Sequence, residues 1–183
     1  NFSIIGLHEL RKGHLVLLKA LAMLISRRAD LYDRVIVNIE GHGDLTRSLM
    51  NFVNENNLSS LVNFHENVEN ISKFYKDTDV LVHPSLFSED LPNVISEAMS
   101  FGIPTIGSNI AGIPSQISDG ENGFLVEPAD HSVLSQRMET LLDRPEILNA
   151  MSNKCVAKFN TQYNSDVAVN RYIDLIEEKI EHE

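Results

Sequence analysis

The sequence predicts an α/β fold, a doubly wound, Rossmann-like parallel sheet of about six strands with a helical C-terminal region. Three observations predict it. Short apolar or β-branched runs alternate with longer segments of helical periodicity. Glycine or proline follows most of the short runs, and after residue 130 the spacing is helical throughout. Strands that alternate with helices pair in parallel, because a parallel crossover usually contains a helix.

The expected strands are short apolar runs bounded by turn residues. The run over residues 2–5 ends at Gly6, and the β-branched run over 35–39 stops shortly before Gly41. Pro84 bounds the fourth run in the same way. The four remaining strands are expected at residues 62–64, 80–82, 104–107 and 123–126.

The helices follow from apolar side chains that recur every three or four residues and therefore share one face. In the first helix, over 13–29, this face holds Leu17, Leu18, Leu21, Leu24 and Ile25. Gly102 follows the fourth helix, at a position where helices commonly end. The other helices are expected at 44–56, 71–75, 93–101, 131–143, 145–157 and 166–181.

Length and composition fit one globular domain over residues 1–183. The chain has 43% hydrophobic and 22% charged residues, and its 183 residues suffice to bury a sizeable core. No stretch has the roughly 20 apolar residues of a membrane span. Cys155 is the single cysteine, which excludes an internal disulfide, and we expect a buried thiol in a reducing compartment. Because the chain starts without Met and directly in a strand, we expect a fragment of a longer protein.

The net charge of −11, from 15 basic and 26 acidic residues, argues against a nucleic-acid partner. The charge is uneven, since residues 1–34 contain six Lys or Arg but three Asp or Glu. A local positive patch on an acidic protein suits a small anion better than a polyanion or an anionic membrane. The histidines are scattered without metal-ligand spacing, so we expect no metal site.

In doubly wound folds, ligands bind in the loops at the carboxyl ends of the strands, and two such loops contain paired glycines. The first loop, residues 6–13, ends in Lys12 and Gly13 before a helix, where an ammonium beside free N–H groups suits a phosphate. A solvated basic loop is the alternative, and the residue order is not that of a Walker P-loop. Gly41 and Gly43 in the second loop allow either close approach of a ligand or a plain tight turn.

The loop after the fourth strand leads into a helix that is suited to bind an anion. We expect Pro92 as the first helical residue, because proline fits that position. The free N–H groups near Leu91, Asn93 and Val94 would then face the ligand edge with the positive end of the helix dipole.

Two carboxylates accompany this helix start. Glu89 lies in the loop, and Glu97 lies about one turn into the helix. Carboxylates beside an anion site indicate sugar hydroxyls as partners, because one carboxylate accepts two hydrogen bonds from a vicinal diol. The alternative is a loop acid and an ordinary surface acid.

Taken together, these motifs resemble glycosyltransferase family 4. The resemblance rests on the E-x7-E motif from Glu89 to Glu97, the Lys12-Gly13 pair and the glycine turn at 41–43. It extends to residues 78–85, 102–106, 109–114 and 119–128. It covers nearly the whole chain and is to the C-terminal, nucleotide-sugar-binding half of a two-domain GT-B fold. The acceptor-binding N-terminal half is absent from this sequence.

The resemblance implies a retaining, metal-independent glycosyltransferase of polysaccharide biosynthesis. It would transfer a hexose-type sugar from a nucleotide-diphosphate donor to a glycan or lipid-linked acceptor, with no further cofactor. The full-length protein is expected to be cytoplasmic and to meet a membrane only through the missing domain, at the inner face. We expect the fragment alone to be inactive, because the second wall of the cleft is needed to position the reacting atoms.

The resemblance also assigns roles. Lys12 and Glu89 are the expected catalytic residues, Lys12 neutralising the donor diphosphate beside Gly13 and Glu89 contacting the donor sugar. Glu97 would hold the ribose hydroxyls. The remaining donor-binding positions are Leu91, Asn93 and Val94 for the diphosphate and His65, Glu66 and Val68 beside the base.

Departures from the family pattern keep a second interpretation open. Leu7 stands where the family commonly has Arg, so the diphosphate site lacks one cation, for which Arg11 or His8 would have to compensate. Glu66 stands where a Gly is usual. A degenerate, non-catalytic nucleotide-binding module of the same fold is therefore the alternative. A phosphoacceptor receiver fails because the early strands lack terminal Asp clusters, and the E-x7-E loop argues against a sugar-nucleotide epimerase.

Overall fold

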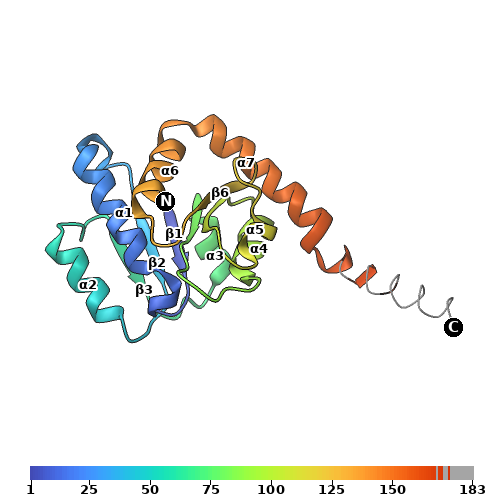
Figure 1. Ribbon diagram of the computed structural model, residues 1–183, viewed down its shortest axis with the longest axis horizontal. Helices are drawn as coiled ribbons and strands as arrows, with labels where there is room; N and C mark the ends of the chain where they lie inside the picture. The colour runs from blue at the N-terminus through green and yellow to red at the C-terminus, as the bar shows by residue number, and fades with distance from the viewer. Residues whose placement is uncertain (168, 171–172, 174–183) are drawn as a thin grey trace.

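The computed structural model describes residues 1–167, 169–170 and 173 and contains a six-stranded parallel sheet (Figure 1). The strand order is β3-β2-β1-β4-β5-β6. This order confirms the predicted doubly wound fold. The strands are β1 (Phe2–Ile5), β2 (Val37–Glu40), β3 (Val62–His65), β4 (Val80–His83), β5 (Thr105–Ser108) and β6 (Gly123–Val126).

The helices lie where the apolar spacing predicts them, with ends shifted by a few residues. They are α1 (His14–Arg27), α2 (Thr46–Glu55), α3 (Ile71–Lys76), α4 (Asn93–Ser100), α6 (His131–Asp143) and α7 (Pro145–Lys158). A 3-10 turn, Leu10–Lys12, precedes α1, and Gly13 separates the two with a left-handed φ of 71°. The helix expected at 166–181 lies largely outside the described residues.

Three features of the backbone differ from the expectation. The sequence analysis predicts no element at the short helix α5 (Ile113–Gln116), because four residues cannot display a helical period. Residues Phe159–Tyr163 form a π-helical turn that extends α7. The second strand begins at Val37 rather than at residue 35, because its register with β1 starts at the pair Phe2 and Val37.

Each face of the sheet is covered by helices. On one face, α1, α2 and α6 pack on side chains such as Phe2, Ile4 and Val82. On the other face, α4 and α5 pack on Leu81, and α7 adds Cys155, whose thiol is buried as expected. Burial of apolar surface on both faces stabilises the sheet and leaves the loops at its carboxyl edge to carry polar groups.

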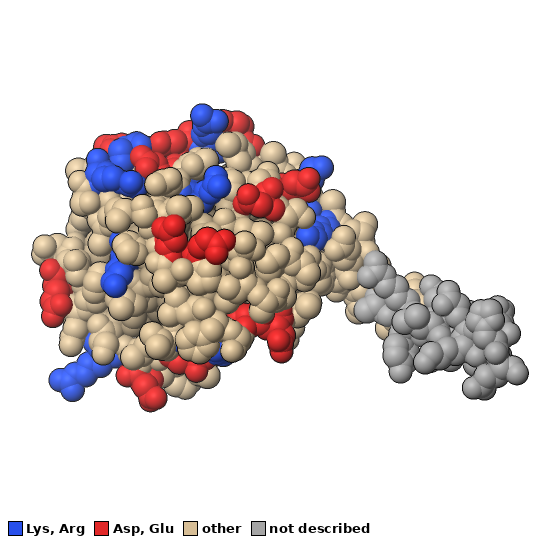
Figure 2. Space-filling model, viewed as in Figure 1, with Lys and Arg blue, Asp and Glu red and all other residues tan. Residues whose placement is uncertain are grey.

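The basic residues of the first 34 positions do not form one patch, which corrects the expectation from the charge distribution. Arg28 at the end of α1 donates to Glu139 and Asp143 of α6, each at 2.9 Å. Figure 2 shows Lys and Arg intermingled with Asp and Glu on this face. Arg11 and Lys12 precede α1, whereas Arg28 follows it, so the length of the helix lies between them. Arg11 and Lys12 therefore form a smaller basic group at the opposite edge of the molecule.

The first loop, residues 6–13, packs closely against the loop after β4, residues 84–92, which we call the third loop, and this packing requires glycine at position 13. A Cβ atom there would overlap the carbonyl oxygen of Pro84, and the φ of 71° is itself unfavourable for other residues. Gly120 has a similar φ of 77°, but a Cβ there would meet nothing within 4 Å. The two positions therefore differ mainly in the steric contact.

We predict that Gly13→Ala lowers the free energy of unfolding by clearly more than Gly120→Ala does. The left-handed conformation alone should cost about 1–2 kcal/mol at either site, whereas at position 13 the backbone of the third loop must also move. Urea unfolding of the two variants and the wild type measures the difference. Equal losses would contradict the close contact between Gly13 and Pro84.

Candidate functional site

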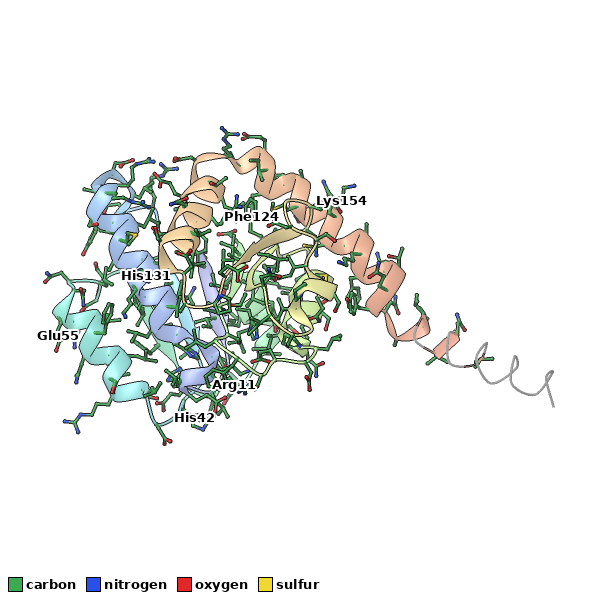
Figure 3. All side chains as sticks on the ribbon, in the orientation of Figure 1. Arg11, His42, Glu55, Phe124, His131 and Lys154 are labelled. Atoms are coloured by element: carbon green, nitrogen blue, oxygen red, sulfur yellow. The ribbon has the colours of Figure 1, made fainter. Side chains whose placement is uncertain are left out.

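The strand order reverses between β1 and β4, and the loops that follow these strands form the candidate site. In doubly wound sheets the loops on the two sides of such a reversal diverge and leave a crevice for ligands. Here the loops are residues 6–13 and 84–92, and the Leu86 amide donates to the Arg11 carbonyl at 2.8 Å. Figure 3 shows Arg11 at the lower edge of the molecule, together with His42 from the loop after β2. This is the carboxyl edge of the sheet.

Glu89 connects the two loops. Its side chain is 7% exposed, and its Oε1 lies 2.5 Å from Lys12 Nζ and 2.6 Å from Arg11 Nη1. Ser85 Oγ donates to the same oxygen at 3.1 Å. A buried carboxylate is costly unless it is paired and hydrogen-bonded, and here donors from both loops satisfy it. The predicted pair, Lys12 and Glu89, is thus in direct contact.

Burial and hydrogen bonding fix the charge of this cluster. Burial opposes ionisation of Glu89, yet the neighbouring His83 and Lys12 outweigh it and lower the pKa of Glu89 to about 2. His83 Nε2 lies 3.6 Å from Glu89 Oε1, and burial lowers the pKa of His83. Glu89 is therefore ionised at neutral pH, and Arg11 and Lys12 carry the positive charge opposite it.

Two further buried histidines adjoin the cluster. The rings of His8 and His14 meet edge to face, with their centroids 4.8 Å apart. His8 Nδ1 lies 2.7 Å from Thr46 Oγ1, so the hydroxyl holds the ring of this first-loop residue against the start of α2. Burial, with the nearby His8, His83 and Lys12, lowers the pKa of His14 to about 3. These imidazoles are neutral, so His8 does not supply the cation that Leu7 lacks.

The helix α4 starts at the crevice. Pro92 is its N-cap residue, with an extended ψ of 118°, so it precedes Asn93 instead of forming the first helical residue as expected. The amides of Asn93 and Val94 belong to the first turn, where the helix itself offers no acceptors, and they carry the positive end of the dipole. Leu91, just before the cap, is exposed at the rim.

Residues of α5 and the glycine before it hold the backbone of the third loop. The Gly112 amide donates to the Glu89 carbonyl at 3.1 Å, and Gln116 Nε2 donates to the Pro92 carbonyl at 3.3 Å. A Cβ at position 112 would overlap the Asp90 carbonyl oxygen, so only glycine allows this approach. The short helix α5 thus fixes the backbone that presents Glu89 and the start of α4.

Glu97 lies one turn into α4 and is held by Tyr75 of α3. The Tyr75 hydroxyl donates to Glu97 Oε2 at 2.7 Å, and the Tyr75 ring, 2% exposed, stacks on Phe101 with centroids 5.2 Å apart. Burial and the hydrogen bond to Glu97 raise the pKa of Tyr75, so the hydroxyl remains a donor. The carboxylate of Glu97 is thereby oriented at an exposed position of the helix.

The predicted base-binding stretch follows β3. His65 Nε2 lies 3.3 Å from Asn38 Oδ1, and the His65 ring meets Phe74 edge to face at 5.6 Å. Glu66 is exposed, and Val68 is half-buried. Because Phe74 and Tyr75 are neighbours in α3, this helix contacts both His65 and Glu97, the two predicted ends of the nucleoside site.

The glycine turn at 41–43 is explained by contacts within the protein. A Cβ at Gly41 would overlap the Gly6 carbonyl oxygen, and one at Gly43 would press on the backbone of His8. The His8 amide also donates to the His42 carbonyl at 2.9 Å. Of the two alternatives, the structure favours a tight turn that packs against the first loop over close approach to a ligand.

Lys12, Gly13, Glu89 and the start of α4 therefore share one edge of the sheet, as the sequence predicts. Sequence reasoning did not assign Ser85 or Tyr75 to the site. Ser85 follows a Pro at the end of a strand and has no signal of its own. Tyr75 resembles an ordinary core residue, because its hydroxyl partner is 22 positions away.

Three further observations concern a groove beside this site, metal ligands and membrane-spanning helices. A mostly apolar groove of about 540 Å³ between α1 and α2 is lined by Gly13 and Leu86 of the two loops but not by Lys12 or Glu89. In the part of the chain that the structure describes, no three His, Cys, Asp or Glu side chains gather as they would around a metal ion. Nor is any helix of that part long and apolar enough to cross a bilayer.

Comparison with known proteins places this geometry in context. Residues 3–156 match the family glycosyl transferases group 1. A D-inositol 3-phosphate glycosyltransferase of Streptomyces griseus is 28% identical over 149 residues, which are 78% of this chain and 31% of the relative. The chain spans about a third of the length of such curated relatives.

Two solved structures share the fold. The structure of Anabaena Alr3699/HepE in complex with UDP has a TM-score of 0.85 at 21% identity and covers 97% of this chain and 48% of that one. The C-terminal domain of the group 1 protein LpcC from Francisella tularensis has a TM-score of 0.80 at 20% identity, with 90% and 86% covered. The sheet, the loops at its reversal point and the match over residues 3–156 lead to one conclusion: this chain belongs to the glycosyl transferases group 1 family.

Proposed function

We propose that the chain is the C-terminal, donor-binding domain of a two-domain GT-B glycosyltransferase of family 4. In this proposal the whole protein is a retaining, metal-independent enzyme that moves a hexose-type sugar from a nucleotide diphosphate to a glycan or lipid-linked acceptor. It works in the cytoplasm, and the acceptor-binding domain, outside this sequence, provides any contact with the inner face of a membrane. The isolated chain binds the donor without turning it over.

One observation carries the proposal. Lys12, the first turn of α4 and the oriented carboxylate of Glu97 lie at the carboxyl edge beside the strand reversal. A cation and a helix start suit a diphosphate, and a carboxylate suits a vicinal diol. The spacing along α4 therefore matches a ligand that has a diphosphate next to a ribose.

The same groups suggest how the leaving diphosphate is stabilised. As the bond to the sugar breaks, negative charge grows on the diphosphate. Lys12 and the N–H groups of Asn93 and Val94 are positioned for that charge before the reaction, and such preorganised stabilisation is usually the largest catalytic contribution. Glu89, in the loop on the other side of Pro92, is assigned to the sugar.

The comparisons support this assignment from outside the chain. The Anabaena protein with the same fold has been solved with UDP and with UDP-glucose. Curated relatives are named D-inositol 3-phosphate glycosyltransferases. UDP is therefore the first nucleotide to test, with GDP and ADP beside it.

The second candidate is a non-catalytic nucleotide-binding module of this fold. The observations that favour it are Leu7, which is 53% exposed at the crevice and offers no donor, and the exposed Glu66 in the base-binding stretch. Both candidates bind a nucleoside diphosphate, so they separate only when the full-length protein is assayed for sugar transfer.

We predict that the chain binds UDP with a dissociation constant on the order of 0.1–1 mM and that Lys12→Ala weakens binding roughly 10- to 150-fold. The reason is the loss of a charge-assisted contact worth about 1.5–3 kcal/mol. Isothermal titration calorimetry measures both. Lys154→Ala is the matched control, because Lys154 is exposed on α7, far from Arg11 in Figure 3. Equal affinities of the two variants for UDP would contradict a contact between Lys12 and the diphosphate.

We predict that Tyr75→Phe weakens UDP binding about 3- to 10-fold, the value of one hydrogen bond, and leaves the binding of inorganic pyrophosphate unchanged. Without the Tyr75 hydroxyl, Glu97 is no longer held for the ribose, whereas the diphosphate contacts remain. Tyr32→Phe is the control, since Tyr32 bonds to Ser60 on the surface. Parallel loss of UDP and pyrophosphate binding would indicate general damage to α4 instead.

A further inference from the structure

Two cations share a single carboxylate oxygen at the centre of the site. Arg11 Nη1 and Lys12 Nζ lie 2.6 and 2.5 Å from Glu89 Oε1, and Arg11 Nη2 lies 2.6 Å from Glu9 Oε1. The two positive and two negative charges cancel within this group. In this arrangement the cluster therefore offers an incoming anion no net positive charge, although two strong donors are present.

We propose that Glu89 pairs with Arg11 and Lys12 until the donor binds, that the donor diphosphate then takes over both cations, and that Arg11 is therefore the second diphosphate-binding cation. The inference rests on the proposed function and deepens it. A diphosphate competes well for these donors, because it carries more charge and more acceptor oxygens than one carboxylate. No covalent step is involved; the cations exchange hydrogen-bond partners.

The position of Arg11 suits this role. It directly precedes Lys12 in the 3-10 turn, and its backbone is fixed by the Leu86 amide. Its side chain is 29% exposed, compared with 16% for Lys12, so the guanidinium faces the open side of the cluster. A planar guanidinium can bind two phosphate oxygens at once. The first loop thus provides two adjacent cations even though Leu7 is apolar.

Glu89 keeps one hydrogen bond after the exchange. Ser85 Oγ, at 3.1 Å, still donates to Oε1, and His83 Nε2 lies 3.6 Å away. The Glu89 carbonyl keeps its hydrogen bond from the Gly112 amide, so the backbone need not move. The positions that Arg11 and Lys12 leave on Oε1 become available to a sugar hydroxyl. Capture of the diphosphate therefore precedes, and permits, the contact of Glu89 with the sugar.

The test compares Arg11→Gln and Glu89→Gln with the wild type by calorimetric titration with UDP and with inorganic pyrophosphate. Arg144→Gln, an exposed arginine before α7, is the matched control. Thermal unfolding of each variant establishes that it is folded. We expect Arg11→Gln to bind both probes about 10-fold more weakly. We expect Glu89→Gln to bind both about 3- to 10-fold more tightly, because the competing carboxylate is gone.

Two results would overturn the exchange: an Arg11→Gln variant that binds UDP as Arg144→Gln does, or a folded Glu89→Gln variant that binds UDP more weakly than the wild type. Arg11 is partly exposed, so Arg11→Gln decides the question alone if Glu89→Gln does not fold. A wild-type chain that binds none of UDP, GDP, ADP and pyrophosphate would contradict the proposed function, and this inference with it. If the wild type binds UDP and Arg11→Gln binds it equally well, only the exchange is contradicted and the proposed function stands.

Discussion

The carboxylate of Glu89 is the interaction on which the rest of the site depends. It joins the loop after β1 to the loop after β4, the two loops that diverge at the strand reversal. Without it, Arg11 and Lys12 would repel each other, and without them a buried carboxylate would carry a large desolvation penalty. Each part is stable only with the others, so the loops, and the start of α4 that follows them, are held in one arrangement.

In this arrangement, elements on both faces of the sheet contribute groups to the site. The first loop, ahead of α1, supplies the cations, while α4 supplies oriented amides and Glu97. On the face of the sheet that α4 covers, α3 contributes a hydrogen bond and no charge pair: the hydroxyl of the buried Tyr75 donates to one oxygen of Glu97. Groups for the diphosphate thus come from the first loop and from α4, which also carries Glu97 for the hydroxyls, and these elements meet because parallel strands bring their carboxyl ends to one edge.

The fold and half of the site could be predicted from local patterns, and the remainder could not for a physical reason. Apolar periodicity predicts the strands and the long helices. Gly13 and Glu89 are predicted as site residues because they lie in loops that follow strands. Contacts between distant loops leave no such pattern. Sequence reasoning names Arg11 only as an alternative to His8, and its contact with Glu89, 78 positions away, appears only in the structure. Tyr75 is not predicted at all, because its partner Glu97 is 22 positions away. Likewise, basic residues that are close in sequence separate when α1 carries Arg28 to the other end of the molecule.

A nucleotide-diphosphate site at the carboxyl edge beside the strand reversal would place UDP against the backbone amides of the first loop and of α4. Titration of ¹⁵N-labelled protein with UDP, followed by backbone amide chemical shifts, tests it most directly. We expect shifts concentrated at Lys12, Gly13, Asn93 and Val94, with the amides of the opposite edge, such as Asp79, unchanged. Shifts concentrated instead along the apolar groove between α1 and α2, for example at Phe52, would contradict it, as would no shifts at saturating UDP.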